Sequence, residues 1–456
     1  MAQARRLQLR LAMGNQPDSM LISWNSPNTS VPGLVQVRLC SEGEPLHLFS
    51  GTTAEGSSCY TVGSTVHSVE VDGLLPGTQY YYGARVEPGE WSEWMSFRTP
   101  SEKLGVDHTF AVIGDLGVTF GGPVTRALAS AVEAEGIQMV VHNGDVGYAD
   151  SEIKPSNGTR YQDFLDYHYE NTSVFASRIP YMLMPGNHEA PCNFQEFTRR
   201  AVRPAMQRGD YYSFTSGAIH FIMLSAEHGQ LSGKMDDPQT GWLQNELERA
   251  LQMKRNGSIN WIFTFVHYPK QPFGYCTYNL PFCSTPPDAT QEWFEDLFAS
   301  HEVDIHFAAH QHVYERTFPV HRQQPVFPNA SIPAPHPGMF PSGSQDIFND
   351  PPYPVYLVNG AAGDDVVFPQ NWLSPPAWSA VNSRTVQFGY TTVRVSPNCL
   401  NVSYRVPLEA EPGVQKVFTM DEFSIVKTTA GQHRKATLLR SSVRKAPNMP
   451  WSSVVV

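Results

Sequence analysis

The stretch that decides the fold is Met139-Val140-Val141-His142-Asn143-Gly144-Asp145-Val146-Gly147-Tyr148. It begins as a short apolar run, which is typical of a buried strand, and then breaks at a glycine that precedes a carboxylate and a phenol. Asp145 is therefore predicted to lie just beyond the end of a strand. In open α/β sheets the carboxyl ends of the strands line the ligand crevice, so this position indicates a functional site.

The same arrangement recurs along the chain, with an apolar β run followed within a few residues by a metal-type side chain. The runs and the residues that follow them are Phe110–Ile113 before Asp115, Tyr181–Met184 before Asn187, Trp261–Val266 before His267, and Ile305–Ala309 before His310 and His312. Because strand ends on one edge of a sheet converge, we expect these side chains to meet at one site.

Together these residues supply two carboxylates, an amide oxygen, three imidazoles and a phenol. That set suffices for two metal ions that share a bridging carboxylate, whereas a single ion would leave several ligands idle. His310 and His312 flank one residue, so in an extended segment both point to the same face. Glycines beside Asp115, Asp145 and Asn187 allow the sharp turns that bring each ligand to an ion.

The first hundred residues have a different pattern. Short alternating runs such as Ser19–Trp24 are separated by Pro, Gly, Asn and Ser, without helical periodicity. The stretches Leu74–Tyr82 and Trp94–Pro100 resemble strand edges of a fibronectin type III-like domain. We therefore predict an all-β sandwich over residues 1–103, followed by a linker near Pro100–Asp107.

From residue 107 onward, apolar β runs alternate with amphipathic helices predicted at Val124–Glu135, Trp242–Lys254 and Gln291–Ser300. This alternation indicates an α/β layered domain, which we place at residues 107–405. Residues 406–456 are expected to form a C-terminal extension, and its end carries basic residues without acidic ones after Lys427, which is typical of a solvated and partly disordered tail.

Charge and hydropathy exclude several classes of protein. A net charge of -11 and a pI near 5.8 give no broad basic surface for nucleic acid. No apolar run reaches the roughly eighteen residues of a membrane helix, and no secretory signal is visible at the start of the chain.

Six cysteines and six Asn-x-Ser/Thr triplets favour an oxidising, glycosylating route, although free buried thiols remain the alternative reading. Two of the cysteines, Cys276 and Cys283, lie close together in the sequence. The candidate glycosylation sites are Asn28, Asn157, Asn171, Asn256, Asn329 and Asn401.

In order and spacing, the five blocks resemble the signature of purple acid phosphatases within the metallophosphoesterases. The resemblance implies a four-layer αββα catalytic domain and a dinuclear centre of Fe(III) with a divalent Zn, Fe or Mn. It implies that Asp115, Tyr148 and His312 bind the Fe(III), that Asp145 bridges, and that the remaining ligands bind the divalent ion, namely Asn187, His267 and His310. A phenol with a pKa near 10 binds as phenolate only beside a strongly acidic ion, which fits a trivalent iron.

The resemblance also implies hydrolysis of small phosphate monoesters by a metal-activated hydroxide, and a secreted or lysosomal location. His188 is the candidate catalytic acid, because the family motif carries a substrate-contacting histidine there; the alternative is a supporting histidine without proton transfer. Glu315 and Arg316 are expected to support the site, where a salt bridge could fix the loop after His312. Other histidines in apolar strands, such as His142, His220 and His306, are expected to be core residues.

Two departures from the family pattern are visible. The last block has Ala309 where glycine is usual, and we expect metal binding to survive the added methyl group. The segment Gly274–Tyr278 lacks the histidine pair of plant-type members, so substrate contacts should differ. Two alternatives remain open: a metallophosphoesterase that acts on phosphodiesters or nucleotides, and an inactive adhesion or binding protein.

Overall fold

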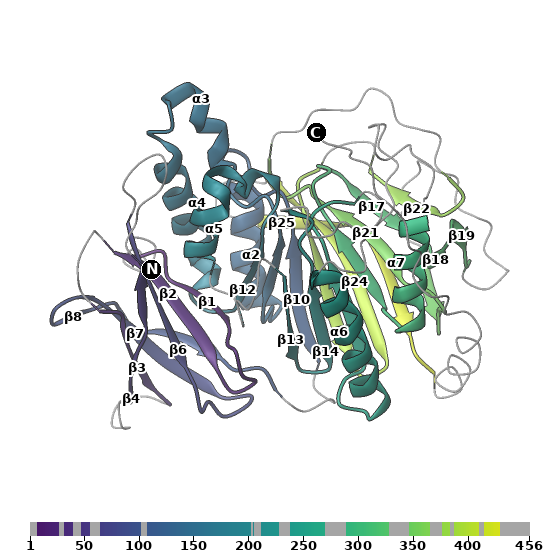
Figure 1. Ribbon diagram of the computed structural model, residues 1–456, viewed down its shortest axis with the longest axis horizontal. Coiled ribbons are helices and arrows are strands. Elements are labelled where there is room, and N and C mark those ends of the chain that lie inside the picture. Colours follow the sequence, from purple (N-terminus) through teal and green to yellow (C-terminus); the bar gives the residue numbers. More distant parts are fainter. Residues whose placement is uncertain are drawn as a thin grey trace.

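The computed structural model describes residues 7–26, 32–39, 47–54, 64–101, 107–201, 204, 211–227, 238–269, 289–327, 346–364, 376–383, 387–409 and 415–428. Within these residues a β-rich N-terminal unit precedes a larger α/β unit, and Figure 1 shows the two side by side. The predicted order, a β-sandwich followed by an α/β layered domain, is confirmed.

The N-terminal unit is a sandwich of two antiparallel sheets. The first, in the order β1-β2-β6-β5, consists of Arg10–Met13, Met20–Ser26, Thr65–Val71 and Thr52–Ala54. The second, in the order β4-β3-β7-β8 with β9 on β7, consists of His47–Ser50, Leu34–Arg38, Gln79–Glu87, Glu90–Trp91 and Met95–Arg98. Between the sheets lie the large buried rings of Trp24, Tyr82 and Phe97. These rings supply much of the apolar burial that stabilises so small a unit.

The α/β unit contains two seven-stranded sheets. The first, in the order β12-β11-β10-β23-β24-β25-β20, consists of Tyr181–Met184, Val140–Asn143, His108–Ile113, Tyr390–Ser396, Cys399–Glu409, Gln415–Val426 and Asp346–Asn349. The second, in the order β13-β14-β15-β16-β21-β17-β22, consists of Tyr212–Ser216, Ile219–Met223, Trp261–Phe265, Ile305–Ala308, Val355–Asn359, Tyr314–Thr317 and Ser379–Asn382. Strands β10 to β12 are parallel to one another, and so are β14, β15, β16 and β21.

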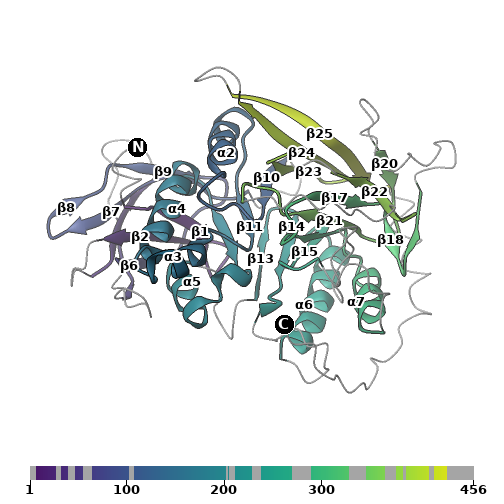
Figure 2. The ribbon, with the colours of Figure 1, turned by 90° about the horizontal axis from the view of Figure 1, so that it is seen from above.

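Helices cover the outer face of each sheet, as Figure 2 shows from above. On the first sheet lie α2, α4 and α5, which span Gly122–Ala134, Tyr161–Ala176 and Gln195–Arg200. On the second lie α6 and α7, which span Pro238–Arg255 and Ala289–Ser300. The inner faces of both sheets share one apolar core, which includes Phe110 and Phe263. The result is the expected four-layer αββα arrangement, and the three predicted helices correspond to α2, α6 and α7.

Short elements complete the α/β unit. They are the 3-10 turns Ala149–Glu152, Asn187–Glu189 and Pro191–Phe194, the helical turn α3 at Ile153–Ser156, and the small hairpin of β18 and β19 at Val320–His321 and Gln324–Pro325. One 3-10 turn directly follows Tyr148 and another begins at Asn187, so both adjoin residues that the sequence analysis assigned to the metal site.

The sandwich is joined to the α/β unit through buried polar contacts. Tyr82 in β7 donates its hydroxyl to the carbonyl of Ser177, at 2.8 Å, and Arg10 in β1 donates from Nε to the carbonyl of Arg200, at 3.0 Å. Arg10 and Arg200 are both buried. Because buried polar groups must find partners to offset their desolvation, these bonds fix the sandwich against α4 and α5.

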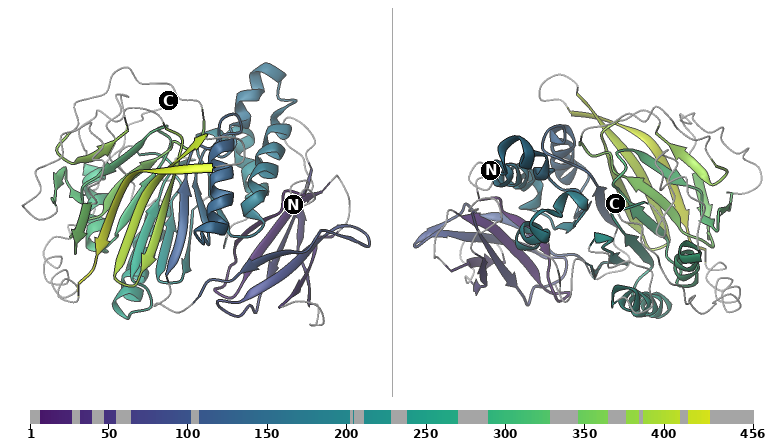
Figure 3. Two further views of the ribbon diagram at one scale, coloured as in Figure 1. Left: turned by 180° about the vertical axis from the view of Figure 1, so that it is seen from behind. Right: turned by 45° about the horizontal axis from the view of Figure 1, so that its top comes forward.

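The structure extends the α/β unit beyond the boundary expected from the sequence. Residue 405 falls inside β24, and β25 pairs along the length of that strand, as Figure 3 shows from behind. The sheet therefore continues to Val426. Most of the expected linker, the Gly274–Tyr278 segment and the basic tail lie outside the described residues. None of the helices in the described part of the chain is long and apolar enough to cross a membrane.

Candidate metal centre

The candidate ligands come from five strand ends that meet at one edge of the two sheets. Asp115, Asp145 and Asn187 follow β10, β11 and β12 of the first sheet. His267 follows β15, and His310 follows β16, in the second sheet. Parallel strands place their carboxyl ends on the same side, which is why ligands far apart in the sequence come together.

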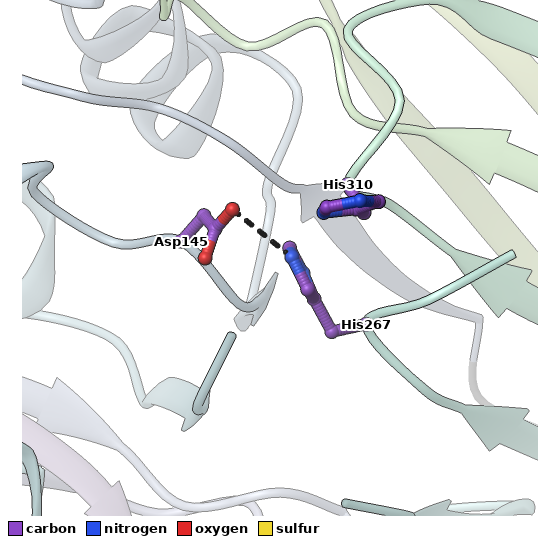
Figure 4. A group of neighbouring side chains, drawn as sticks. All are labelled: Asp145, His267 and His310. Atoms are coloured by element: carbon purple, nitrogen blue, oxygen red, sulfur yellow. Dashed lines mark ion pairs between the residues drawn. The ribbon is translucent and has the colours of Figure 1, made fainter. Parts of the chain in front are cut away.

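Asp145, His267 and His310 form the tightest group. Their ligand atoms all lie within 4.8 Å of one another, and Asp145 Oδ2 is 3.0 Å from His267 Nε2. Figure 4 shows the three side chains turned toward a common point. His267 Nδ1 lies 2.9 Å from the carbonyl of Asn143, which leaves Nε2 directed at the carboxylate. A histidine held in this way through one nitrogen presents the other as a metal ligand.

A second group gathers around the phenol of Tyr148. Its hydroxyl lies 2.9 Å from Asp115 Oδ1, 2.8 Å from His312 Nε2 and 3.3 Å from Asp145 Oδ2. His312 Nε2 is also 3.4 Å from Asp115 Oδ1. Asp145 thus contacts a residue of each group, His267 on one side and Tyr148 on the other.

Asn187 begins the 3-10 turn after β12, and the side-chain oxygen of this residue has no hydrogen-bond partner among the described residues although the atom is buried. The next N–H, that of His188, donates to Asp145 Oδ1 at 2.9 Å, so this turn adjoins the Asp145 carboxylate. A buried amide oxygen without a partner costs free energy unless a cation or another donor meets it. This atom therefore fits a metal ligand.

The backbone is strained at the candidate ligands. Asp115, Asp145, Tyr148 and His310 adopt φ values of 58°, 53°, 52° and 66°. Non-glycine residues rarely occupy this left-handed region, and such residues cluster at functional sites where the surrounding structure holds them. Here the left-handed backbone conformation turns each side chain toward the common centre.

Two glycines allow the close approach of these segments. A Cβ atom at Gly144, whose φ is +87°, would overlap the ring of His267, and one at Gly186 would overlap the carboxylate of Asp145. Ala309 also fits, since its methyl group faces Gly114, which has no side chain. The substitution that departs from the usual glycine of the last block is therefore accommodated by the glycine opposite.

The electrostatics of the centre reflect burial and mutual pairing. Burial raises the pKa of the Asp115 carboxyl above its usual range, although His312 opposes that shift. Burial alone would also raise the pKa of Asp145, but His267 and His188 hold this pKa well below its usual range. Burial opposes the charged form of His267, yet Asp145 and Asp115 raise the pKa of His267 to about 10. The carboxylates thus create a field that attracts cations.

His188 is held by a carboxylate that the sequence analysis did not assign. Its Nδ1 lies 2.8 Å and 2.9 Å from the two carboxylate oxygens of Asp150, and its ring lies 4.1 Å from the Tyr148 ring. His188 Nε2 lies 3.9 Å from Asp145 Oδ2. Asp150 therefore fixes the imidazole so that Nε2 faces the centre. The sequence offered one signal for this role, because Asp150 lies two residues after the candidate ligand Tyr148.

Glu189 is a second residue that the sequence analysis left without a role. Its buried carboxylate accepts the N–H groups of Gly186, Asp145 and Val146 at 2.8 Å, 3.0 Å and 2.8 Å. These bonds tie the turn after β12 to the turn after β11. Glu189 thus holds together the segments that carry Asn187 and Asp145.

Arg316, which was expected to support the metal site, pairs with two carboxylates of the first sheet. Arg316 Nε donates to Asp421 Oδ2 at 2.7 Å, and another guanidinium nitrogen lies 2.8 Å from Asp346 Oδ2. Successive residues of a strand point to opposite faces, so Arg316 and its neighbour Glu315, which is also buried in β17, are directed differently. Arg316 therefore joins the two sheets.

The histidines expected in the core do lie there with partners. His142 contacts the Tyr181 hydroxyl, His220 contacts Glu246, and His306 contacts the Thr264 hydroxyl.

The described candidate glycosylation sites differ in exposure. Asn157 and Asn256 lie in exposed turns, whereas Asn171 and Asn401 are half-buried in α4 and β24. Asn28 and Asn329 lie outside the described residues.

Three family models match consecutive parts of the chain. Residues 7–99 match the N-terminal domain of purple acid phosphatases, residues 108–314 match the calcineurin-like phosphoesterase domain, and residues 353–405 match the iron/zinc purple acid phosphatase-like C-terminal domain.

Two relatives are similar to most of the chain in sequence, and one solved structure is similar to it in fold. Acid phosphatase type 7 of Mus musculus is 28% identical over 409 residues, which cover 85% of this chain and 84% of that protein. The Fe(3+)-Zn(2+) purple acid phosphatase 12 of Arabidopsis thaliana is 25% identical, and the match covers 85% of this chain and 78% of that protein. The solved structure of purple acid phosphatase PPD1 from Lupinus luteus has a TM-score of 0.75 at 19% identity, with 97% of this chain and 78% of that chain covered.

Proposed function

Since the chain belongs to the purple acid phosphatase family and is a phosphatase, we propose that it hydrolyses small phosphate monoesters at a dinuclear Fe(III)–M(II) centre. The observation that carries this proposal is the meeting of five strand ends around Asp145, which contacts both His267 and Tyr148. A carboxylate between two groups of ligands is what a bridge between two ions requires.

In this proposal Asp115, Tyr148 and His312 hold the Fe(III), and Asn187, His267 and His310 hold the divalent ion, which is Zn, Fe or Mn. The donor set supports this division, because imidazole and carboxylate suit all three divalent ions, whereas the phenol selects a trivalent one. The partnerless oxygen of Asn187 supports it as well. Ions held by these residues would supply Lewis acidity to a phosphoryl group and would lower the pKa of a water molecule.

We assign to His188 the protonation of the leaving group. Its Nδ1 is bound by Asp150, so the other nitrogen, Nε2, is free to hold a proton on the side of the centre. An alcohol leaves a phosphoryl group more easily when its oxygen receives a proton as the bond breaks. We therefore assign to His188 Nε2 the donation of that proton, and to Asp150 the orientation of the ring.

The proposed organisation of the chain agrees with the ranges of the matching family models. The sandwich occupies residues 1–103, and the catalytic domain begins at 107. With β25 included, it extends past the expected boundary at 405 to Val426, and the basic tail follows.

We further propose a secreted or lysosomal location with N-glycosylation. The six cysteines of the chain and the exposure of Asn157 and Asn256 support this proposal.

The first test is a visible spectrum with metal analysis of the purified full chain, combined with hydrolysis of a chromogenic phosphate monoester. We expect about two metal ions per chain including iron, a broad visible band from phenolate-to-iron charge transfer, and hydrolysis of the monoester. Tyr148→Phe should lose the band. Tyr81→Phe, which alters a tyrosine of β7 in the sandwich, is the matched control and should keep it.

Other outcomes decide between the alternatives. A colourless protein that hydrolyses the ester would replace the iron assignment with an ordinary metallophosphoesterase centre. A faster reaction with a phosphodiester than with the monoester would show that phosphodiesters are the preferred substrates. A metal-free protein without activity would contradict the proposed function.

A further inference from the structure

A polar groove of about 690 Å³ lies between α2 and α4, outside the metal centre. The two helices run side by side on the outer face of the first sheet (Figure 1). The loop that follows Asp115 contributes Leu116 to Thr119 to the lining of the groove. Volumes of this size are typical of sites that hold a small organic ligand.

The α4 wall of the groove presents two side chains without a partner in the described part of the chain. Asn171 is half-buried, and its amide makes no hydrogen bond there. Tyr167 lies one helical turn earlier on the same face and is 53% exposed. Residues four apart on a helix are neighbours, so the amide and the ring lie next to each other.

The opposite wall is polar and contains both donors and acceptors. Thr125, Arg126, Ser130 and Glu133 of α2 line it. Arg178, which lies after α4, forms a salt bridge with Glu133 and so spans the groove. An aromatic ring on one wall and hydroxyl and charged groups on the other suit a sugar ring, whose C–H face is apolar and whose edge carries hydroxyl groups.

Asn171 is the acceptor of an Asn-x-Ser triplet, Asn171-Thr172-Ser173. We propose that an N-linked glycan on Asn171 occupies the groove between α2 and α4, with its first sugar stacked on Tyr167. This inference rests on the secretory location that accompanies the proposed function. In the attachment step Asn171 Nδ2 bonds to C1 of the sugar, the bond from C1 to a diphosphate-linked lipid donor breaks, the diphosphate leaves with the electron pair, and the amide loses a proton.

Two other described triplets provide an internal comparison. Asn157 and Asn256 lie in exposed turns and do not line the groove. Glycans at those positions would extend into solvent. The glycan on Asn171 should instead be held against the protein, and a held glycan is shielded from enzymes that must reach its first bond.

The experiment uses the full chain secreted from a glycosylating eukaryotic host. Peptide mapping by mass spectrometry gives the occupancy of each triplet, and a peptide N-glycosidase then releases glycans from the native and the unfolded protein. We expect Asn171 to be occupied, and its release from the native protein to be about tenfold slower than release from Asn157 or Asn256, a ratio that corresponds to about 1.4 kcal/mol. After unfolding, the rates should be equal.

Tyr167→Ala should remove most of this protection, whereas Tyr167→Phe, which keeps the ring, should retain it. An unmodified Asn171 beside occupied Asn157 or Asn256 would overturn the proposal, and so would release from native Asn171 at the rate of the exposed sites. Hydrolysis of the chromogenic monoester is measured on the same samples. An active protein with unmodified Asn171 would contradict only the glycan proposal. An inactive, metal-free protein with a protected glycan would contradict only the proposed function.

Discussion

Among the described residues, the buried charged cluster around His312 and the one around Arg316 differ in how their charges are balanced. Around His312 and Asp145 the carboxylates face imidazoles, a phenol and the partnerless oxygen of Asn187. Around Arg316 one guanidinium meets Asp421 and Asp346, and Asp421 also accepts the Tyr314 hydroxyl at 2.7 Å.

The positions of the two clusters explain the difference. The first lies at strand ends, where loops can turn side chains with acceptor atoms toward one point. The second lies on β17, β20 and β25 and joins the two sheets, where Arg316 also packs 4.8 Å from the ring centre of Phe423. A buried guanidinium paired with carboxylates of the other sheet supports the fold, whereas carboxylates that face neutral ligand atoms prepare a site for cations.

The largest effect should follow from breaking the first cluster with Asp145→Asn. We expect kcat to fall by about a thousandfold, because the charge that serves both ions is lost and each 1.36 kcal/mol of barrier is tenfold in rate. Steady-state kinetics with metal analysis measures it. Asp163→Asn, an exposed carboxylate of α4, is the control. A variant with two ions per chain and a nearly normal kcat would show that Asp145 is not the bridge.

Breaking the second cluster should instead affect folding. Arg316→Met leaves Asp421 buried without its cation, and we expect the free energy of unfolding to drop by about 3 kcal/mol. Arg322→Met is the matched control, because Arg322 pairs with Asp296 at the surface and should lose less than about 1 kcal/mol. Urea unfolding monitored by circular dichroism measures both. Equal losses in the two variants would contradict the assigned role of Arg316.

The buried His306, four residues before His310, extends the comparison, because no described carboxylate contacts its ring. Its ring contacts the Thr264 hydroxyl and the rings of Phe298 and Tyr356. Burial lowers its pKa to about 3, whereas the carboxylates raise the pKa of His267 to about 10.

For His306 the unfolded chain binds the proton more readily than the folded protein does. The contribution of neutral His306 to the free energy of unfolding is therefore fully present above pH 6.5. It is lost as the pH falls from 6.5 toward 3. We expect about 2 kcal/mol of stability to be lost at this residue between pH 7 and pH 5. His306→Asn should flatten the pH dependence of the unfolding free energy, and the exposed His47→Asn should not. An unchanged slope in His306→Asn would rule this contribution out.

The smallest effect concerns the orientation of His188. Asp150→Asn should lower kcat by about tenfold with the metal content unchanged, because the ring loses the partner that fixes it. The loss should be greater for an alkyl phosphate than for an ester of an acidic phenol, whose leaving group needs no proton. Equal losses for both substrates would place Asp150 outside the proton-transfer step.

Much of this architecture could be predicted from local patterns. Apolar runs gave the strands before Asp115, Asp145 and His267, and amphipathic periodicity gave α2, α6 and α7. Helix α4 was missed, since Tyr161–Ala176 mixes aromatic and polar residues without a clear apolar stripe. Strand β25 was placed in the C-terminal extension because charged residues such as Asp421 interrupt its apolar alternation, and its pairing with β24 is decided by the sheet.

The sequence by itself determined which ligand types follow which strands. Each of the five segments contains both an apolar strand and its ligand within a few adjacent residues, so no tertiary information is needed to find them. Only the tertiary structure decided which atoms meet: that Asp150 holds His188, that Arg316 pairs with Asp421, 105 residues away, and that Asn171 faces a groove. These contacts depend on how sheets and helices pack, and packing joins residues whose separation along the chain carries no periodic signal.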